Sequence, residues 1–308
     1  MRSALSFNAL LMQAVFVFLV LCVGLCTGAA AQDDDDGTII VDTNLVVLNA
    51  TVLDAKNAVI AGLKQKNFTI FEDGVEQKIE FFEAEETPFA AVILIDTSTS
   101  MDSRVSIARS AAITFLDGLR ADDMVAIYKF DSTVKLLQDF SQSRDVPEAA
   151  YDMKARGMTK MYDAMFQAVQ DLSKRPEKRK AILVLSDGED TFSGKSADKV
   201  LKAAIAINAT VYTIDMSSSE DMSNKKKQNV SVLRNFADKS GGRFSSAFGG
   251  AGLRESLKSV VQELGSQYTL GYQPTNTATD GKYRSIRLGV SKPGARVRTR
   301  EGYNAPKK

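Results

Sequence analysis

Apolar runs and helical periods alternate along the middle of the chain, over residues 89–265. Four apolar runs predict strands, at Ala90–Ile95, Met124–Phe130, Ala181–Leu185 and Ala209–Ile214. Between and after them, apolar residues recur at steps of three and four and predict helices; the three clearest faces are Val105, Ala108, Ala112, Phe115 and Leu119, then Met161, Met165, Ala168 and Leu172, and last Leu253, Leu257, Val260, Val261 and Leu264. This alternation predicts an α/β fold, a doubly wound and mostly parallel sheet with ligand sites at the carboxyl ends of its strands.

Residues 38–88 and 266–304, on either side of this domain, have the patterning of β-structure. The runs Phe68–Phe71 and Val75–Phe82 flank Glu72-Asp73-Gly74, which predicts a hairpin. In its second arm Val75, Ile79 and Phe81 share one face, with Gln77 the exception. After the last helix we predict strands at Tyr268–Tyr272, Tyr283–Val290 and Arg296–Arg300. Because small isolated sheets are marginally stable, we expect the two segments to pair into one β-sandwich with the α/β domain inserted between them. A separate fold for each segment is the alternative.

The first 31 residues have the pattern of a secretory signal peptide. Arg2 precedes an apolar stretch from Ala14 to Cys26, and Ala29-Ala30-Ala31 provides a small-residue cleavage site before Gln32. The stretch is shorter than the roughly 20 residues of a membrane span. We therefore predict a secreted or periplasmic protein without a stable membrane span after cleavage, and an uncleaved N-terminal anchor is the alternative. Residues 32–37 are predicted to be an acidic linker.

Composition and charge exclude several kinds of chemistry. The 308 residues carry a formal charge of +1, which gives no electrostatic case for binding nucleic acid. The chain has no His, which excludes Ser-His-Asp catalysis and His-ligated zinc. Its two cysteines, Cys22 and Cys26, both lie in the predicted signal peptide, so the mature chain has neither disulfides nor a thiol nucleophile.

Oxygen-bearing side chains follow two of the predicted strands and precede one predicted helix. Asp96-Thr97-Ser98-Thr99-Ser100 follows the first strand, Thr159 precedes the helix that starts at Met161, and Asp187 follows the strand Ala181–Leu185. Each residue alone has a structural explanation, since Thr159 could cap the helix and Asp187 could form a turn with Gly188. Together they supply two carboxylates and three hydroxyls, a donor set that suits Mg²⁺ or Mn²⁺.

With these residues the chain resembles the von Willebrand factor A (VWA) domain over residues 89–265. The metal-ion-dependent adhesion site of that family has the form D-x-S-x-S, then a separate Thr and a separate Asp. The resemblance implies that Asp96, Ser98, Ser100, Thr159 and Asp187 bind the metal, and that an Asp or Glu of a protein partner completes its coordination. The flanks Val75-Glu76-Gln77-Lys78-Ile79 and Tyr268-Thr269-Leu270-Gly271-Tyr272 look like secreted VWA-related proteins common in acidobacteria.

Other charged residues near the motif have simpler interpretations. Asp102 is expected to cap the helix that starts near Arg104. Asp163 and Asp131 are candidates to hydrogen-bond the metal ligands without touching the metal. Lys225-Lys226-Lys227 is predicted to be a solvated loop and not a polyanion site.

The leading functional hypothesis is a metal-dependent protein-binding or adhesion module without catalytic activity. A metal-assisted phosphatase is an alternative, because an aspartate at the end of the first strand can accept a phosphoryl group in such folds. Ser98 stands where haloacid-dehalogenase-like phosphatases carry a second Asp, which leaves no general acid or base there. A structural envelope component with an incidental metal site is the third hypothesis.

Overall fold

The computed structural model describes residues 45–84, 87–145, 147–217, 223–247 and 249–307. The predicted signal peptide and acidic linker lie outside these ranges. No helix within the described ranges is long and apolar enough to cross a lipid bilayer.

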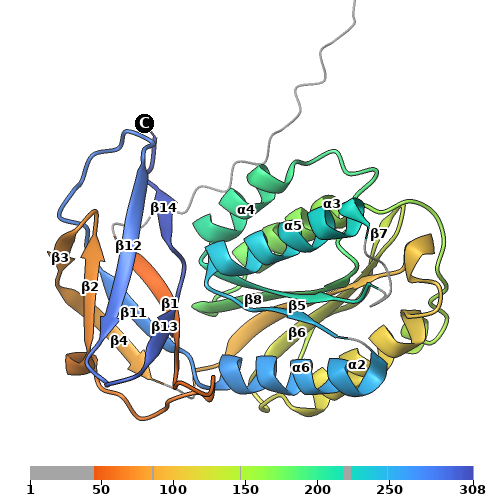
Figure 1. Cartoon of the computed structure of the whole chain (residues 1–308), viewed down its shortest axis with the longest axis horizontal. Coiled ribbons are helices and arrows are strands. Elements are labelled where there is room, and N and C mark those ends of the chain that lie inside the picture. The colour runs from red at the N-terminus through yellow and green to blue at the C-terminus, as the bar shows by residue number, and fades with distance from the viewer. Residues whose placement is uncertain (1–44, 85–86, 146, 218–222, 248, 308) are drawn as a thin grey trace, which may run out of the picture. The chain divides into compact units, whose positions relative to one another are not determined.

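A six-stranded sheet is the centre of the α/β part (Figure 1). Its order is β10-β9-β8-β5-β6-β7, and all neighbours are parallel except β6 and β7. The strands are β5 (Phe89–Asp96), β6 (Met124–Phe130), β7 (Val134–Ser141), β8 (Arg179–Ser186), β9 (Ala209–Asp215) and β10 (Phe244–Ser246). The chain passes from β5 to β6 on one side and later returns to β8 on the other, so the strand order reverses next to β5.

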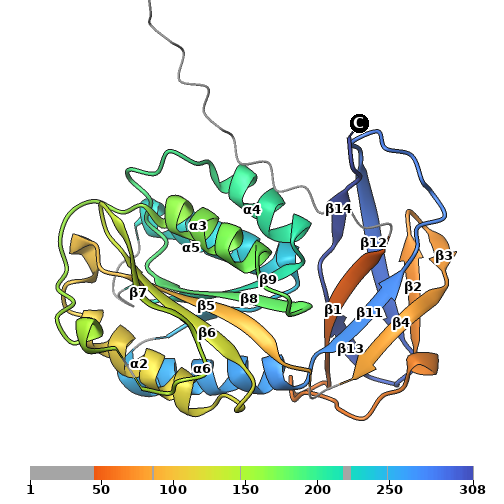
Figure 2. The ribbon, with the colours of Figure 1, turned by 180° about the vertical axis from the view of Figure 1, so that it is seen from behind.

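Five helices cover the two faces of this sheet. Figures 1 and 2 show α2 (Val105–Asp117) and α6 (Gly249–Gly265) on one face, and α3 (Met161–Ser173), α4 (Ala197–Ala206) and α5 (Asn224–Ser240) on the other. Three 3-10 turns, η1 (Gln65–Asn67), η2 (Thr99–Met101) and η3 (Glu148–Ala150), complete the helical elements of the described residues.

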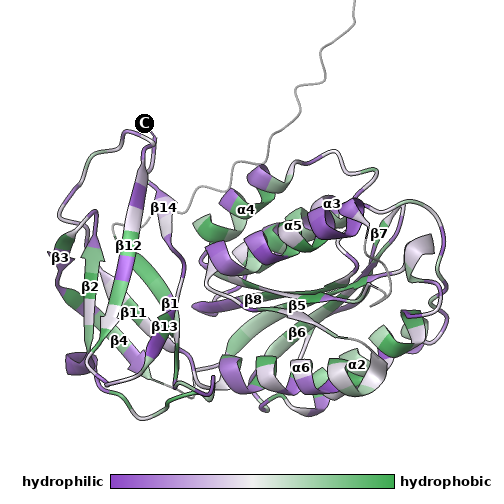
Figure 3. Cartoon of the chain, in the orientation of Figure 1, coloured by the Kyte–Doolittle hydropathy of each residue, from purple (hydrophilic) through white to green (hydrophobic). Residues whose placement is uncertain are grey.

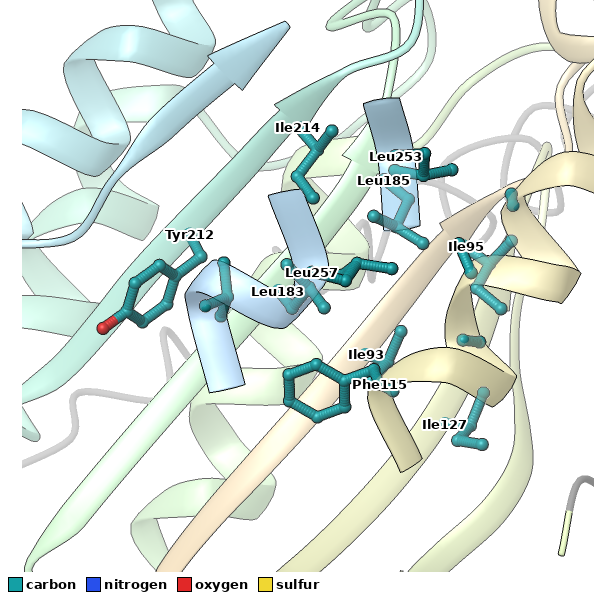
Figure 4. Packing of buried hydrophobic residues seen from close by; sticks show 14 of the residues in the cluster. Ile93, Ile95, Phe115, Ile127, Leu183, Leu185, Tyr212, Ile214, Leu253 and Leu257 are labelled. Atoms are coloured by element: carbon teal, nitrogen blue, oxygen red, sulfur yellow. The ribbon is translucent and has the colours of Figure 1, made fainter. Parts of the chain in front are cut away.

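Both faces of the sheet are buried, so each strand supplies alternate residues to two apolar cores. On β5, Ile93 and Ile95 pack toward α2 and α6, together with Phe115 and Leu257 (Figure 4). The neighbouring β5 residues Val92 and Leu94 belong to the opposite core, with α3, α4 and α5. Burial on both faces explains why the sequence of β5 reads as a continuous apolar run without alternation.

The flanking β segments form two four-stranded sheets. One has the order β13-β1-β11-β4 and the other the order β14-β12-β2-β3. The strands are β1 (Val46–Leu53), β2 (Phe68–Glu72), β3 (Val75–Gln77), β4 (Ile79–Ala84), β11 (Tyr268–Tyr272), β12 (Tyr283–Val290), β13 (Arg296–Arg298) and β14 (Gly302–Asn304). Strands from before and after the α/β part pair directly, as β1 does with β11 and β2 with β12.

A single apolar core lies between these two sheets, which makes them a β-sandwich. Leu48, Leu270, Ile70 and Leu288, two from each sheet, belong to it. Along β12 inward-facing and outward-facing residues alternate, and Figure 3 shows the alternation as bands of colour. The predicted fold class, an α/β domain inserted between β segments, is confirmed.

Several local predictions are wrong. The run Val75–Phe82 is not one strand, because it leaves one sheet after Gln77 and enters the other at Ile79. Consequently Val75 is exposed, whereas Gln77 is buried, and its amide group bonds Thr275 through both the side-chain hydroxyl and the backbone N–H. The basic run 225–227 is not a loop, since it forms the first turn of α5.

Candidate metal centre

The predicted site lies at the carboxyl edge of the six-stranded sheet, where the strand order reverses. Asp96 is the last residue of β5, and Asp187 directly follows β8. The two strands are parallel neighbours, with Ile95 opposite Leu185. The fold therefore delivers both aspartates to the same edge, in the position where open α/β sheets bind ligands.

Asp96 is fully buried and held by two hydrogen bonds. Its Oδ1 accepts the Ser98 backbone N–H at 2.8 Å, and its Oδ2 accepts the Ser186 hydroxyl at 2.5 Å. Burial raises the pKa of the Asp96 carboxyl to about 7, against the opposing effect of hydrogen bonds from Ser186 and Ser98. The negative charge of Asp187 adds to the rise. A buried carboxylate of this kind is stabilised by a nearby cation.

The two motif serines lie together on the turn that follows β5. Ser98 immediately precedes η2, and Ser100 lies within it. Their hydroxyl oxygens are 3.1 Å apart. Ser98 is buried and Ser100 is exposed, so the pair runs from the sheet edge toward solvent.

Backbone hydrogen bonds join the loop that carries Thr159 to its two neighbours. On one side, the carbonyl oxygen of Gly157 accepts the backbone N–H of Thr99 at 3.2 Å and its hydroxyl at 3.0 Å. On the other side, the carbonyl oxygen of Thr159 accepts the N–H groups of Thr191 and Phe192, both at 3.0 Å. The loops after β5, before α3 and after β8 are thus fixed against one another.

Thr159 is not the cap of α3. Lys160 occupies the N-cap position, and no side chain there accepts a capping hydrogen bond. Thr159 is nevertheless 3% exposed, so the residue is buried although its side chain does not cap the helix. The structural explanation that the sequence offered for this residue therefore does not hold.

Asp187 does form the predicted turn, but the turn occupies only one of its oxygens. Its Oδ1 accepts the Glu189 N–H at 3.1 Å across Gly188, which has a φ of +78°. A side chain at Gly188 would be strained there and would also meet the carbonyl oxygen of Asn229 at 2.8 Å. The turn leaves the other carboxylate oxygen available for a second interaction.

The other acidic residues near the motif have structural partners. The prediction that Asp102 caps α2 is wrong. Arg104 is the N-cap residue of α2, and no side-chain hydrogen bond caps the helix there. Asp163 accepts the N–H groups of Gly194 and Lys195, both at 3.0 Å, and so anchors the loop after β8.

Asp131 accepts a hydrogen bond from the hydroxyl of Thr97 in the motif, at 3.4 Å. One of its oxygens accepts Lys129 Nζ at 3.0 Å, and the other accepts the Thr133 N–H and hydroxyl at 2.9 Å. Burial alone would raise the pKa of Asp131, but the hydrogen bonds from Lys129 and Thr133 lower it below its usual value. Asp131 is therefore an ionised partner of Lys129 that braces the loop.

Two residues at this edge were missed from the sequence. The Ser186 hydroxyl donates to Asp96 and accepts the Gly188 N–H at 3.0 Å, which links Asp96 to the turn that follows Asp187. Asp215 ends β9 and repeats the local geometry of Asp96, since its Oδ1 accepts the Ser217 N–H at 2.8 Å. Their positions at the ends of predicted strands were a signal that could have found both.

Residues 91–189 match the family model of the von Willebrand factor type A domain. The chain contains a VWA domain. The matched region begins within β5 and ends just after Asp187, so it includes the positions of all five predicted ligands.

Several known proteins are similar to parts of the chain in sequence or structure. An uncharacterized protein of Synechocystis sp. is 29% identical over 135 residues, which is 41% of this chain and 32% of that protein. The chain thus spans about a third of the length of this relative. A von Willebrand factor type A structure from Catenulispora acidiphila is similar with a TM-score of 0.47 and 15% identity, over 86% of this chain and 74% of that one. An aerotolerance-related membrane protein from Bacteroides fragilis is similar with a TM-score of 0.47 and 16% identity, over 57% and 98% of the two chains.

The donor set of the VWA domain suits a hard divalent cation. Within the described ranges, no group of three or more His, Cys, Asp or Glu residues is arranged to hold a metal. The predicted set is of another kind, because only Asp96 and Asp187 are charged and the other three donors are hydroxyls. Two carboxylates balance the charge of one divalent ion, and an all-oxygen set matches Mg²⁺ or Mn²⁺.

Removing the Ser186 hydroxyl is expected to weaken cation binding. In Ser186→Ala the Asp96 carboxylate loses the 2.5 Å hydrogen bond that orients it, and groups that orient ligands are typically worth about 10–100-fold in metal affinity. Calorimetric titration with Mg²⁺ measures the change. Ser246→Ala is the matched control, because Ser246 donates at 3.3 Å to the corresponding oxygen of Asp215. Equal affinities for Ser186→Ala and the parent protein would contradict the role of Ser186.

Proposed function

We propose that the VWA domain binds a protein partner through Mg²⁺ or Mn²⁺. Asp96, Ser98, Ser100, Thr159 and Asp187 would hold the cation, some of them through water. A carboxylate of the partner would complete the coordination, as the family resemblance implies. VWA domains generally mediate interactions between proteins, which agrees with this proposal.

One observation carries the proposal: the charge and burial of Asp96. Its carboxyl is completely buried and accepts hydrogen bonds from the Ser98 N–H and the Ser186 hydroxyl, and burial raises its pKa to about 7. No basic side chain of the described residues forms an ion pair with Asp96. Burying an unpaired carboxylate costs free energy, and buried carboxylates are usually paired or bound to a metal. The adjacent hydroxyls and the carboxylate of Asp187 would supply the remaining protein ligands of a cation.

The proposed function is binding without catalysis, and its proposed place is outside the cytoplasm, with the protein either secreted or in the periplasm. Ser98 in place of a second acid and the absence of His both argue against phosphoryl transfer. The signal-peptide pattern of residues 1–31 supports export.

Capture of partners from an envelope extract tests this function. The purified protein is immobilised and exposed to extract in Mg²⁺ and, separately, in excess chelator. We expect specific proteins to be retained only with Mg²⁺, and Asp96→Ala to retain none because the metal is lost. Retention of the same proteins in chelator, or by Asp96→Ala, would refute the proposal.

A further inference from the structure

Two large apolar side chains are exposed directly beside Thr159. Met158 precedes it in the chain, and Phe192 is tied to it by a 3.0 Å hydrogen bond from its own N–H to the Thr159 carbonyl oxygen. Met158 is 51% exposed and Phe192 is 53% exposed. The described ranges contain only four other large apolar residues of comparable exposure, so a pair at the proposed metal centre indicates a contact surface.

The loops that carry this pair are anchored. Asp190 accepts the Ser193 hydroxyl at 2.6 Å and the N–H of Tyr162 on α3 at 3.2 Å. Lys160 Nζ lies 5.1 Å from the centre of the Phe192 ring. The hydrogen bonds of Asp190 anchor the loop, and Phe192 stays about half exposed. A surface fixed in advance loses little conformational entropy when a partner binds.

Two exposed basic residues precede Met158 on the same loop. Arg156 is exposed, and its backbone N–H donates to the Thr97 carbonyl oxygen of the motif loop at 2.9 Å. Lys154, two residues earlier, is also exposed. No acidic side chain of the described residues forms an ion pair with either of them. On the far side Glu189 is neutralised by Lys225, at 2.6 Å.

We infer that the partner presents a short acidic segment with an apolar side chain next to the carboxylate that reaches the metal. The apolar side chain packs on Met158 and Phe192, and a further acidic residue faces Arg156. This inference rests on the proposed function and specifies its ligand. It commits to a peptide segment because the apolar and basic groups lie on two adjoining loops, the one that carries Thr159 and the one that follows β8.

Selection from a random peptide display library tests the inference. The immobilised protein is washed in Mg²⁺, and bound peptides are eluted with chelator. We expect the eluted peptides to be enriched in Asp or Glu adjacent to an aromatic or aliphatic residue, with a second acid nearby. Chelator-eluted peptides without this bias would overturn the inference and leave the proposed function intact. A lack of chelator-eluted peptides would overturn both.

Variants then test the two contacts with one selected peptide. Met158→Ser and Phe192→Ser should each weaken its binding roughly tenfold, because each removes a buried apolar contact. Tyr283→Ser is the matched control, as Tyr283 is 51% exposed on β12 of the sandwich. Arg156→Glu should weaken binding by a similar factor, whereas Arg287→Glu on β12 should not. Mg²⁺ affinity, measured by calorimetry, should stay unchanged in all of them. Unchanged peptide affinity in Met158→Ser, Phe192→Ser and Arg156→Glu would refute the contacts.

Discussion

Asp96→Asn should abolish measurable binding of Mg²⁺ and Mn²⁺ to the VWA domain. The substitution keeps the size of the side chain and an Oδ1 that can accept the Ser98 N–H, so the loop after β5 keeps its geometry. It removes one of only two negative charges in the proposed ligand set. Loss of a direct anionic ligand should cost more than the 10–100-fold typical of groups that merely orient a ligand. Isothermal titration calorimetry with each metal measures the effect.

Asp215→Asn provides the matched control for this experiment. Asp215 ends β9, is 1% exposed and accepts the Ser217 N–H at 2.8 Å, so its local setting copies that of Asp96. It is not among the proposed ligands, and its substitution should leave metal affinity unchanged. A full titration curve for Asp96→Asn would contradict the proposed site. Loss of binding only in Asp215→Asn would move the cation to the end of β9.

The α/β part could be predicted because its strands are buried on both faces. The run Met124–Phe130 became β6 with the same limits, and the face beginning at Val105 became α2. The elements missed in this part, such as β7 and α5, have weaker patterns. β7 is an edge strand, and its residues are partly exposed. α5 begins with Asn-Lys-Lys-Lys, a polar run that predicts a loop unless Ser223 is recognised as the residue that caps the helix.

The β segments were harder to read locally than globally. We could predict that the two segments pair because small isolated sheets are marginally stable. That prediction does not require knowing which residues pair with which. The change of sheet between Gln77 and Ile79 has no such signature, because one residue between two strands is enough to redirect the chain. The exposure of Val75 and the burial of Gln77 on β3 therefore could not be predicted.

Four of the predicted ligands lie just after apolar runs, a position that sequence can reveal, and Ser186 shares this position. The hydrogen bond from Ser186 to Asp96 is harder to predict. Ser186 is a single hydroxyl at the end of β8, and its bond to Asp96 depends on β5 and β8 being neighbours in register. Asp102 shows the reverse problem, because its spacing suits a helix cap, yet the chain forms η2 first and starts α2 only at Val105.

The metal-free protein should lose stability as the pH rises from about 4 to about 7. The folded state raises the pKa of Asp96 from 3.8 to about 7, so between these values the folded chain holds a proton that the unfolded chain has released. Stability falls with pH wherever the folded state binds more protons. The contribution of Asp96 is fully present below pH 4 and is lost as the pH rises through about 7. The rise of the Asp96 pKa from 3.8 to about 7 corresponds to about 4 kcal/mol of folding free energy.

Urea unfolding in chelator at several pH values measures this loss, and the difference between parent and Asp96→Asn isolates it. Other groups titrate as well, because burial raises the pKa of Asp123 while Asp131 has a lowered one. Those contributions are common to both proteins and cancel in the difference. Asp96→Asn should therefore show the flatter profile and be the more stable protein at pH 8. Saturating Mg²⁺ should restore stability at pH 8 in the parent only, by about 2.7 kcal/mol at a hundred times the dissociation constant. Parallel pH profiles for the two proteins would show that Asp96 does not hold a proton in the metal-free fold.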